Sequence, residues 1–376
     1  MSVAETLAEL VAIDSVSSRS NVEIIRFLAA RAEAAGMCAR MFPHTDEAGV
    51  KKFNLVCVPP AVDADRMEVE LALVGHTDTV PYDPAWGDAL ALTEREGKLY
   101  GRGSCDTKGF IAAALTAVER VRVANLRRPL ALVFTADEEV GCLGAKRLAE
   151  SGALSARYAV VGEPTSLQPM RAGKGYCLAS VRVGGSEGHS AYPALGASAI
   201  FRAARLIARI ERVAGALEAE PHAAFDPPYT TLNVGVIGGG TAKNIIAGEC
   251  RFTLEWRPVP GQAAMRAVEL IQAEVESLRA AEPDFDCDIE ILRLDEGAET
   301  SAASPLVREL ETLTGRTAGT VAFGTEAPQL TGMGAEAVVF GPGSIRTAHR
   351  TGEFVPIDEL AACVEILARA IGKFCR

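Results

Sequence analysis

The sequence predicts an α/β protein with a mostly parallel sheet, flanked by helices, and a second domain inserted into it. Three observations support this prediction. Strand-like and helix-like segments alternate up to about residue 175, which is typical of a parallel sheet. Four short apolar runs are each followed by an acidic or imidazole side chain. Between residues 177 and 294 the order becomes β-α-β-β-α-β, the split βαβ (ferredoxin-like) arrangement.

Local signals predict the first helices and strands. Ser2 and Glu5 resemble a capping box that opens a helix to about Ala12. Asn21 is a candidate N-cap of a second helix, which Gly36 is placed to end. The chain then continues as a strand, a polar connection, a glycine-rich loop and an apolar helix, at residues 53–58, 81–100, 101–109 and about 110–123.

Four buried strands are predicted from the short apolar runs, which begin at residues 71, 130, 158 and 337. Such runs are typical of strands that are buried on both faces of a parallel sheet. Polar side chains follow the runs in this order: His76 and Asp78, Glu138 and Glu139, Glu163, and His349. Because ligands bind at the carboxyl edge of open α/β sheets, we expect a site there, joined by Asp106 from the glycine-rich loop.

The inserted domain is placed at residues 177–294, which leaves 1–176 and 295–376 for the catalytic domain. Its predicted strands are 178–183, 231–237, 249–256 and 285–294, and its predicted helices are 197–214 and 262–281. After the insertion the chain adds a helix near 306–313, the strand near Val338 and a closing helix at 358–374.

Composition narrows the possible partners and location. A length of 376 residues allows two domains, and 48% hydrophobic with 23% charged residues is ordinary for a soluble globular protein. The net charge of -11 argues against nucleic acid, and no apolar run reaches the roughly 20 residues that span a bilayer. The N-terminus lacks a signal-peptide pattern and nine cysteines form no CxxC pair, so we expect reduced thiols and a cytoplasmic protein.

The candidate ligands are two imidazoles and three carboxylates, His76, Asp106, Glu139, Glu163 and His349. This donor set suits zinc, manganese or cobalt. Five ligands exceed what one catalytic zinc uses, and two metals that share one carboxylate would account for them. Asp78 is placed to accept the second imidazole N–H of His76, and Glu138 to take a proton from the attacking water.

Each of these residues alone has a plainer interpretation. His349 would be a surface histidine, Asp106 a helix cap, and residues 137–139 a solvated turn or helix start. Cys105, beside Asp106, is interpreted as a small filler that faces away from the site. The conjunction of the motifs at one sheet edge favours the metal site.

Taken together, the motifs resemble the M20 metallopeptidase and deacylase family over nearly the whole chain. The matching stretches are residues 75–78, 101–109, 137–139, 162–164, 188–190, 341–343 and 349–353. The resemblance implies that His76 and Glu163 bind one metal, that Glu139 and His349 bind the other, and that Asp106 bridges them. Asp78 would orient His76 and Glu138 would be the general base. The metals would be zinc, with cobalt as an alternative.

The resemblance also implies a homodimer through the inserted domain, and substrate contacts from that domain. His189 is similar to a family histidine that reaches the partner subunit's site and stabilises the oxyanion. Asn244 and Arg257 are similar to positions that hold a substrate carboxylate, which suits the planar fork of arginine. Thr107 and Ala247 stand where relatives often carry Met and Pro.

The stretch Thr325-Glu326-Ala-Pro328 bears on the substrate, a small N-acyl amino acid. It is similar to the branch of the family that converts N-acetyl-L-ornithine to L-ornithine and acetate, a step of arginine biosynthesis. Glu326 would then face the δ-ammonium group. Desuccinylation of succinyl-diaminopimelate and carboxypeptidase action on amino-acid derivatives or dipeptides stay open as alternatives. So does a catalytically silent relative, although all five ligands and Glu138 are present.

Overall fold

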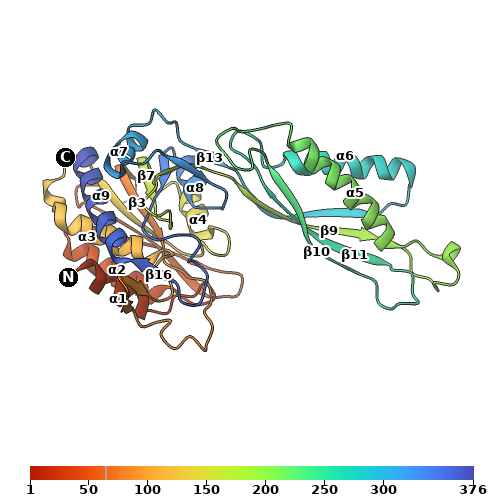
Figure 1. Ribbon diagram of the computed structural model, residues 1–376, viewed down its shortest axis with the longest axis horizontal. Coiled ribbons are helices and arrows are strands. Elements are labelled where there is room, and N and C mark those ends of the chain that lie inside the picture. The colour runs from red at the N-terminus through yellow and green to blue at the C-terminus, as the bar shows by residue number, and fades with distance from the viewer. Residues whose placement is uncertain (64–65) are drawn as a thin grey trace. The chain divides into compact units, whose positions relative to one another are not determined.

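The computed structural model describes residues 1–63 and 66–376, which form two compact units (Figure 1). The first unit comprises residues 1–172, 299–319 and 325–376. The second comprises residues 173–298 and 320–324. Each unit has its own buried hydrophobic core, so each is described by itself.

The sheet of the first unit is mixed, with a parallel centre, and confirms the predicted fold class. Its strands are β1 (Cys38–Thr45), β2 (Lys51–Val58), β3 (Met67–His76), β6 (Leu130–Thr135), β7 (Leu154–Val161), β8 (Met170–Gly173), β13 (Ala298–Glu299), β14 (Gly319–Val321) and β15 (Glu336–Val339). The order is β1-β2-β6-β3-β7-β15-β8-β13, with β14 beside β8. The neighbours β6, β3, β7 and β15 run parallel, so their carboxyl ends meet at one edge.

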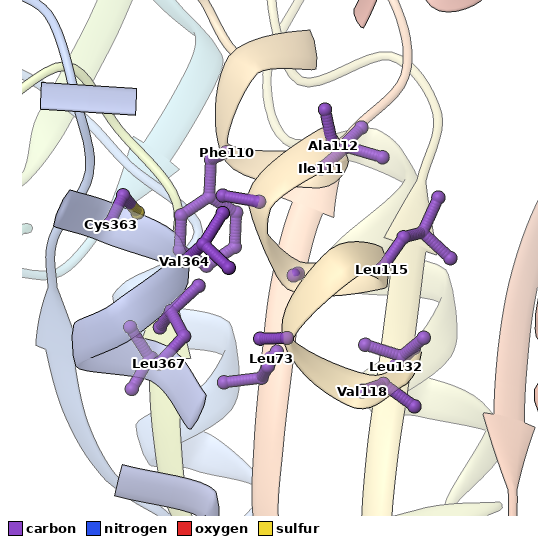
Figure 2. Close-up of a cluster of buried hydrophobic side chains, with 14 of the residues drawn as sticks. Leu73, Phe110, Ile111, Ala112, Leu115, Val118, Leu132, Cys363, Val364 and Leu367 are labelled. Carbon is purple, nitrogen blue, oxygen red and sulfur yellow. The ribbon is translucent and has the colours of Figure 1, made fainter. Parts of the chain in front are cut away.

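Helices cover both faces of this sheet. One face carries α1 (Val3–Ala12), α2 (Val22–Ala34), α3 (Lys108–Val121), α7 (Pro305–Thr314) and α9 (Ile357–Cys375); the other carries α4 (Leu143–Ser151) and α8 (Ala327–Gly332). Side chains of each central strand alternate between the two cores, because successive residues of a strand point to opposite faces. Leu71 and Leu73 of β3 belong to the core on the α3 and α9 side, where Figure 2 shows Leu73, whereas Ala72 and Val74 face the α4 side.

Short elements complete the first unit. The predicted capping box is present, since Ser2 Oγ accepts the Glu5 N–H at 3.2 Å and the Glu5 carboxylate accepts the Ser2 N–H at 2.7 Å. The predicted polar connection at residues 81–100 ends in a hairpin. Its strands β4 (Thr93–Arg95) and β5 (Lys98–Tyr100) form a small antiparallel sheet with β16 (Phe354–Pro356). A 3-10 turn, η1 (Val123–Asn125), follows α3.

The second unit has the predicted β-α-β-β-α-β order. Its elements are β9 (Tyr176–Gly184), α5 (Ala199–Leu217), β10 (Thr231–Gly239), β11 (Glu249–Arg257), α6 (Arg266–Ala281) and β12 (Cys287–Asp295), with a 3-10 turn η2 (Pro193–Leu195) before α5. The antiparallel sheet runs β10-β11-β9-β12, so β10 is an edge strand. Apolar residues of α5 and α6 cover one face of it.

All nine cysteines are free thiols, as predicted. Eight are buried and only Cys38, on β1, is exposed. Burial raises the pKa of several of these thiols, for example to about 12 for Cys57. None of the described helices is both long and apolar enough to cross a membrane.

Candidate metal centre

The strand ends bring most of the predicted ligands to one edge of the first unit's sheet. His76 is the last residue of β3, and Glu139 lies four residues beyond the end of β6. Glu163 follows β7, and Asp106 precedes α3 in the glycine-rich loop. His349 lies on the long connection between β15 and β16.

Four of these side chains are in direct contact. The two oxygens of Asp106 face different imidazoles: Oδ1 lies 3.1 Å from His76 Nε2, and Oδ2 lies 3.1 Å from His349 Nε2. His349 Nε2 also lies 3.0 Å from Glu139 Oε2. One ligand atom each from His76, Asp106 and Glu139 falls within 4.8 Å of the others. Imidazole and carboxylate at this spacing are a donor set for a divalent cation.

Glu163 is the fifth predicted ligand and is almost completely buried, with 4% exposure. Burial raises its pKa well above the usual range, and the negative charges of Asp106 and Glu138 raise it further. The preceding residue must be glycine, because a Cβ at Gly162 would lie 2.1 Å from the ring of Phe110. The close packing of β7 on α3 thus sets the position of Glu163.

The buried carboxylates at the carboxyl edge of this sheet favour the binding of a cation. Burial lowers the pKa of His76, but its hydrogen bond to Asp106 and nearby carboxylates raise it well above the usual range. Hydrogen bonds to Asp106 and Glu139 raise the pKa of His349 to about 10. The carboxylates thus favour the protonated, positively charged form of both imidazoles. A divalent cation would replace those protons, so the residues present fit a metal site.

Glu138 lies beside the ligands without joining their contacts. Burial raises its pKa to about 8, an effect that His76 opposes and Glu139 reinforces. The thiol of Cys142 donates a hydrogen bond to Glu138 Oε1 at 3.3 Å. A carboxylate with a pKa near neutrality is suited to accept and release a proton.

Asp78 makes different contacts from those expected. His76 Nδ1 lies 3.0 Å from the backbone carbonyl of Asp78 and 3.7 Å from its carboxylate, which is too long for a hydrogen bond. The carboxylate instead accepts the N–H groups of Glu138 (3.0 Å) and Glu139 (3.3 Å) and the hydroxyl of Ser17 (2.7 Å). Asp78 thus holds the loop that carries Glu138 and Glu139, while its carbonyl orients the imidazole.

Glu326 is buried in the first unit, with 1% exposure, and it is the N-cap residue of α8. The stretch at residues 325–328 therefore leads into the start of a short helix. Burial raises the pKa of Glu326 to about 7, against the effect of nearby His76. Its Oε1 atom has no hydrogen-bond partner among the described residues.

The other predicted substrate residues lie in the second unit. His189 is exposed, and its Nδ1 accepts the Ala191 N–H at 3.1 Å. Asn244 is also exposed. Arg257 already has partners, because its Nε lies 2.6 Å from Glu255 Oε1 and its guanidinium lies 3.8 Å from the ring centroid of Tyr176.

Sequence reasoning missed a buried ion pair behind Glu138. Lys52 Nζ lies 2.9 Å from Asp137 Oδ1, and the two side chains are 1% and 2% exposed. Asp137 has a left-handed backbone, with φ of +57°, at the turn into Glu138. The amide of Asn54 holds the same loop, donating to the Gly144 carbonyl (2.8 Å) and accepting the Ala136 N–H (3.0 Å). Lys52 and Asn54 carry no local signal for this role, because their partners lie more than 80 residues away.

Comparison with known proteins identifies relatives along the whole chain. The profile of peptidase family M20/M25/M40 matches residues 72–373. An acetylornithine deacetylase from Myxococcus xanthus is 54% identical over 98% of this chain and 97% of its own length. An enzyme of the same name from Proteus mirabilis is 35% identical over 97% of this chain and 93% of its own.

Two solved structures share the fold at low sequence identity. A tripeptidase from Staphylococcus aureus superposes with a TM-score of 0.78 at 23% identity, covering 99% of this chain and 97% of its own. An M20 family metallo-carboxypeptidase from Sulfolobus solfataricus superposes with a TM-score of 0.73 at 18% identity, covering 98% of both chains. They support the two-unit α/β architecture.

Proposed function

The chain belongs to peptidase family M20/M25/M40, and we propose that it is a metal-dependent amide hydrolase that removes the acetyl group from N-acetyl-L-ornithine. The products are acetate and L-ornithine. The observation that carries this proposal is the direct contact of His76, Asp106, Glu139 and His349, in a chain 54% identical to an acetylornithine deacetylase.

Two divalent ions, zinc with cobalt as the alternative, fit the donor set. Asp106 supports a bridging role because each of its oxygens faces a different imidazole. His76 and Glu163 would hold one ion, and Glu139 and His349 the other. Bound there, the ions would polarise the amide carbonyl and lower the pKa of the attacking water.

Glu138 is the group that moves the proton. Its carboxylate accepts a proton from the water as the water oxygen attacks the amide carbon. The C–N bond then breaks, and Glu138 passes the same proton to the leaving nitrogen, which departs as the amine of ornithine. Contacts from Asp78 to two backbone N–H groups hold Glu138 in place for both transfers.

Glu326 supplies the recognition of ornithine in this proposal. It is buried, acidic and without a hydrogen bond at Oε1, so a δ-ammonium group would complete its partners. Arg257 and Asn244 would contact the α-carboxylate, which requires Arg257 to exchange Glu255 for the substrate. His189 would stabilise the oxyanion that forms at the amide oxygen.

A homodimer through the second unit belongs to the same proposal. That unit exposes large apolar side chains on α5, η2 and β10, namely Phe201, Leu195 and Val236 at 70%, 75% and 68% exposure. Exposed apolar groups of this size are typical of contact surfaces. The nine free thiols support a reducing compartment, and we place the protein in the cytoplasm.

A substrate panel tests the proposal. Metal-free protein is reconstituted with zinc or cobalt, and kcat/KM is measured on N-acetylornithine, N-acetylmethionine, N-succinyl-diaminopimelate and a dipeptide. We expect N-acetylornithine to be cleaved fastest and metal-free protein to be inactive. Faster cleavage of the succinyl substrate or the dipeptide would overturn the substrate assignment, and full activity without metal would overturn the metallohydrolase.

A further inference from the structure

Glu353 is a buried carboxylate of the first unit that is not one of the five candidate ligands. It lies four residues after His349 and just before β16, and it is 1% exposed. Its Oε1 atom accepts two consecutive backbone N–H groups, those of Cys105 at 2.9 Å and Asp106 at 3.0 Å. Glu353 therefore joins the connection that carries His349 to the loop that carries Asp106.

The second oxygen of Glu353 is held by Arg102. The Arg102 guanidinium is 3% exposed and pairs with Glu353 Oε2. It also donates to the Pro81 carbonyl at 3.2 Å and lies 5.5 Å from the ring centroid of Trp86. These contacts restrict the arginine to one orientation: its planar fork places Nη1 on the Glu353 carboxylate and Nη2 on the Pro81 carbonyl.

The backbone ties the same two segments together. The Gly101 N–H donates to the Glu353 carbonyl at 3.1 Å, which places the start of the Asp106 loop against the end of the His349 connection. The arrangement parallels Asp78, whose carboxylate accepts the N–H groups of Glu138 and Glu139. Each carboxylate binds two successive amides of a loop that presents a ligand, and neither is among the five predicted ligands.

We propose that Glu353, held by Arg102, is a positioning residue that sets Asp106 and His349 at the separation a pair of divalent ions requires. The inference rests on the metal centre of the proposed function. Asp106 contacts both imidazoles, so a shift of its loop would disturb both metal positions together. Removing such an outer partner of a ligand costs about 10- to 100-fold in metal affinity.

Zinc affinity of folded, metal-free protein tests this role, measured by competition with a chromophoric chelator. We expect Glu353→Gln to bind zinc about 10- to 100-fold more weakly than the wild type, with both equivalents affected. The visible spectrum of bound cobalt should change as well, because the ligand geometry changes. Glu70→Gln is the matched control: Glu70 lies on β3 and is held by Arg128 and Arg157, so the affinity should not change.

A second variant keeps the test decisive. Arg102→Lys retains the charge but loses the fork, and it should also weaken zinc binding; it stands in if Glu353→Gln does not fold. Either variant, if folded and within about twofold of wild-type affinity, would overturn the inference and leave Glu353 a structural brace. A wild-type protein that binds no zinc or cobalt would instead overturn the proposed metal centre itself.

Discussion

Glu138 and Glu139 are adjacent in the sequence but differ in their contacts. The Glu139 carboxylate lies 3.0 Å from His349, whereas the Glu138 side chain, within the described part of the chain, is hydrogen-bonded only to the Cys142 thiol. A carboxylate that does not contact the imidazoles or bind the metal can take up and release a proton. This difference supports the division of roles between base and ligand.

We expect Glu138→Gln to lower kcat by at least about 10²-fold, because an amide cannot accept the proton of the attacking water. Bound metal should stay at the wild-type level, as measured by elemental analysis. Glu150→Gln, an exposed position on α4, should leave kcat unchanged. Near-normal turnover of Glu138→Gln would mean that another group is the base.

The raised pKa of Glu326 predicts that the metal-free protein loses stability as the pH rises. Its pKa is raised from 4.5 in the unfolded chain to about 7 in the folded one, chiefly by burial. Below pH 4.5 it is protonated in both states and has no effect. As the pH rises from 4.5 through 7 the unfolded state loses its proton first, so folding becomes less favourable, by at most about 3 kcal/mol.

Glu326→Gln should therefore melt at a higher temperature than the wild type at pH 8, and at nearly the same temperature at pH 5. Thermal unfolding of metal-free protein at both pH values measures this. A difference of equal size at both values would show that the Glu326 charge is not the cause. The same variant should slow cleavage of N-acetylornithine more than cleavage of N-acetylmethionine, which lacks the ammonium group.

Among the elements, the loop from Ala136 to Gly144 depends most on distant partners. Two of its residues, Asp137 and Cys142, have left-handed backbones; Asp137 is held by Lys52, and the two ends of the loop are held by Asn54. A non-glycine residue in this conformation costs about 1–3 kcal/mol and persists only where its surroundings hold it. β2, which carries Lys52 and Asn54, is thus a support for the loop that carries the base.

Lys52→Met should destabilise the protein by about 3–5 kcal/mol, because the buried Asp137 carboxylate loses its lysine and keeps only the 3.5 Å contact with His44. Urea unfolding measures this loss. Replacing both partners, in Lys52→Met with Asp137→Asn, should recover part of it, since no buried charge remains. Lys51→Met, an exposed neighbour on the same strand, should cost little. Strictly additive losses in the double variant would contradict a coupled pair.

Local sequence patterns predicted the helices and strands well. They predicted contacts between distant segments of the chain less well. The apolar runs after residues 71 and 130 became the fully buried parts of β3 and β6. β1 was missed because its side chains are exposed or half-buried and form no apolar run. Asn21 is the N-cap residue of α2, as expected, but its side chain makes no capping hydrogen bond and binds the backbone of Phe53 on β2 instead.

The candidate site shows the same contrast between local motifs, which could be predicted, and long-range contacts, which could not. Ligand types and their order along the chain were visible as motifs before the structure. The partners that hold the loops carrying these ligands, such as Lys52 for Asp137 and Glu353 for Asp106, are 85 and 247 residues away in sequence. Nothing local marks such pairs, because the fold alone brings them together.

For the whole molecule, the two units divide the proposed active-site residues between them. The candidate ligands and Glu138 belong to the first unit, whereas His189, Asn244 and Arg257 belong to the second. If His189 serves the site of a partner subunit, a complete site can form from two differently damaged chains. This gives the proposed dimer a functional test.

Mixing Glu138→Gln with His189→Ala should restore activity that neither homodimer has. In the mixed dimer one site receives an intact Glu138 from one chain and an intact His189 from the other. His222→Ala, in the same unit as His189, should stay active alone. Two inactive proteins that regain no activity after subunit exchange would count against a shared site.

Because eight of the nine cysteines are buried, the folded protein offers one thiol, Cys38, for chemical labelling. A maleimide dye should attach to Cys38 alone under native conditions, because thiolates react and burial suppresses both access and ionisation elsewhere. Adding Glu218→Cys, exposed on the second unit, provides a second attachment point without removing any natural thiol. Energy transfer between the two dyes would then follow the separation of the units in solution, with and without substrate, in an otherwise unaltered enzyme.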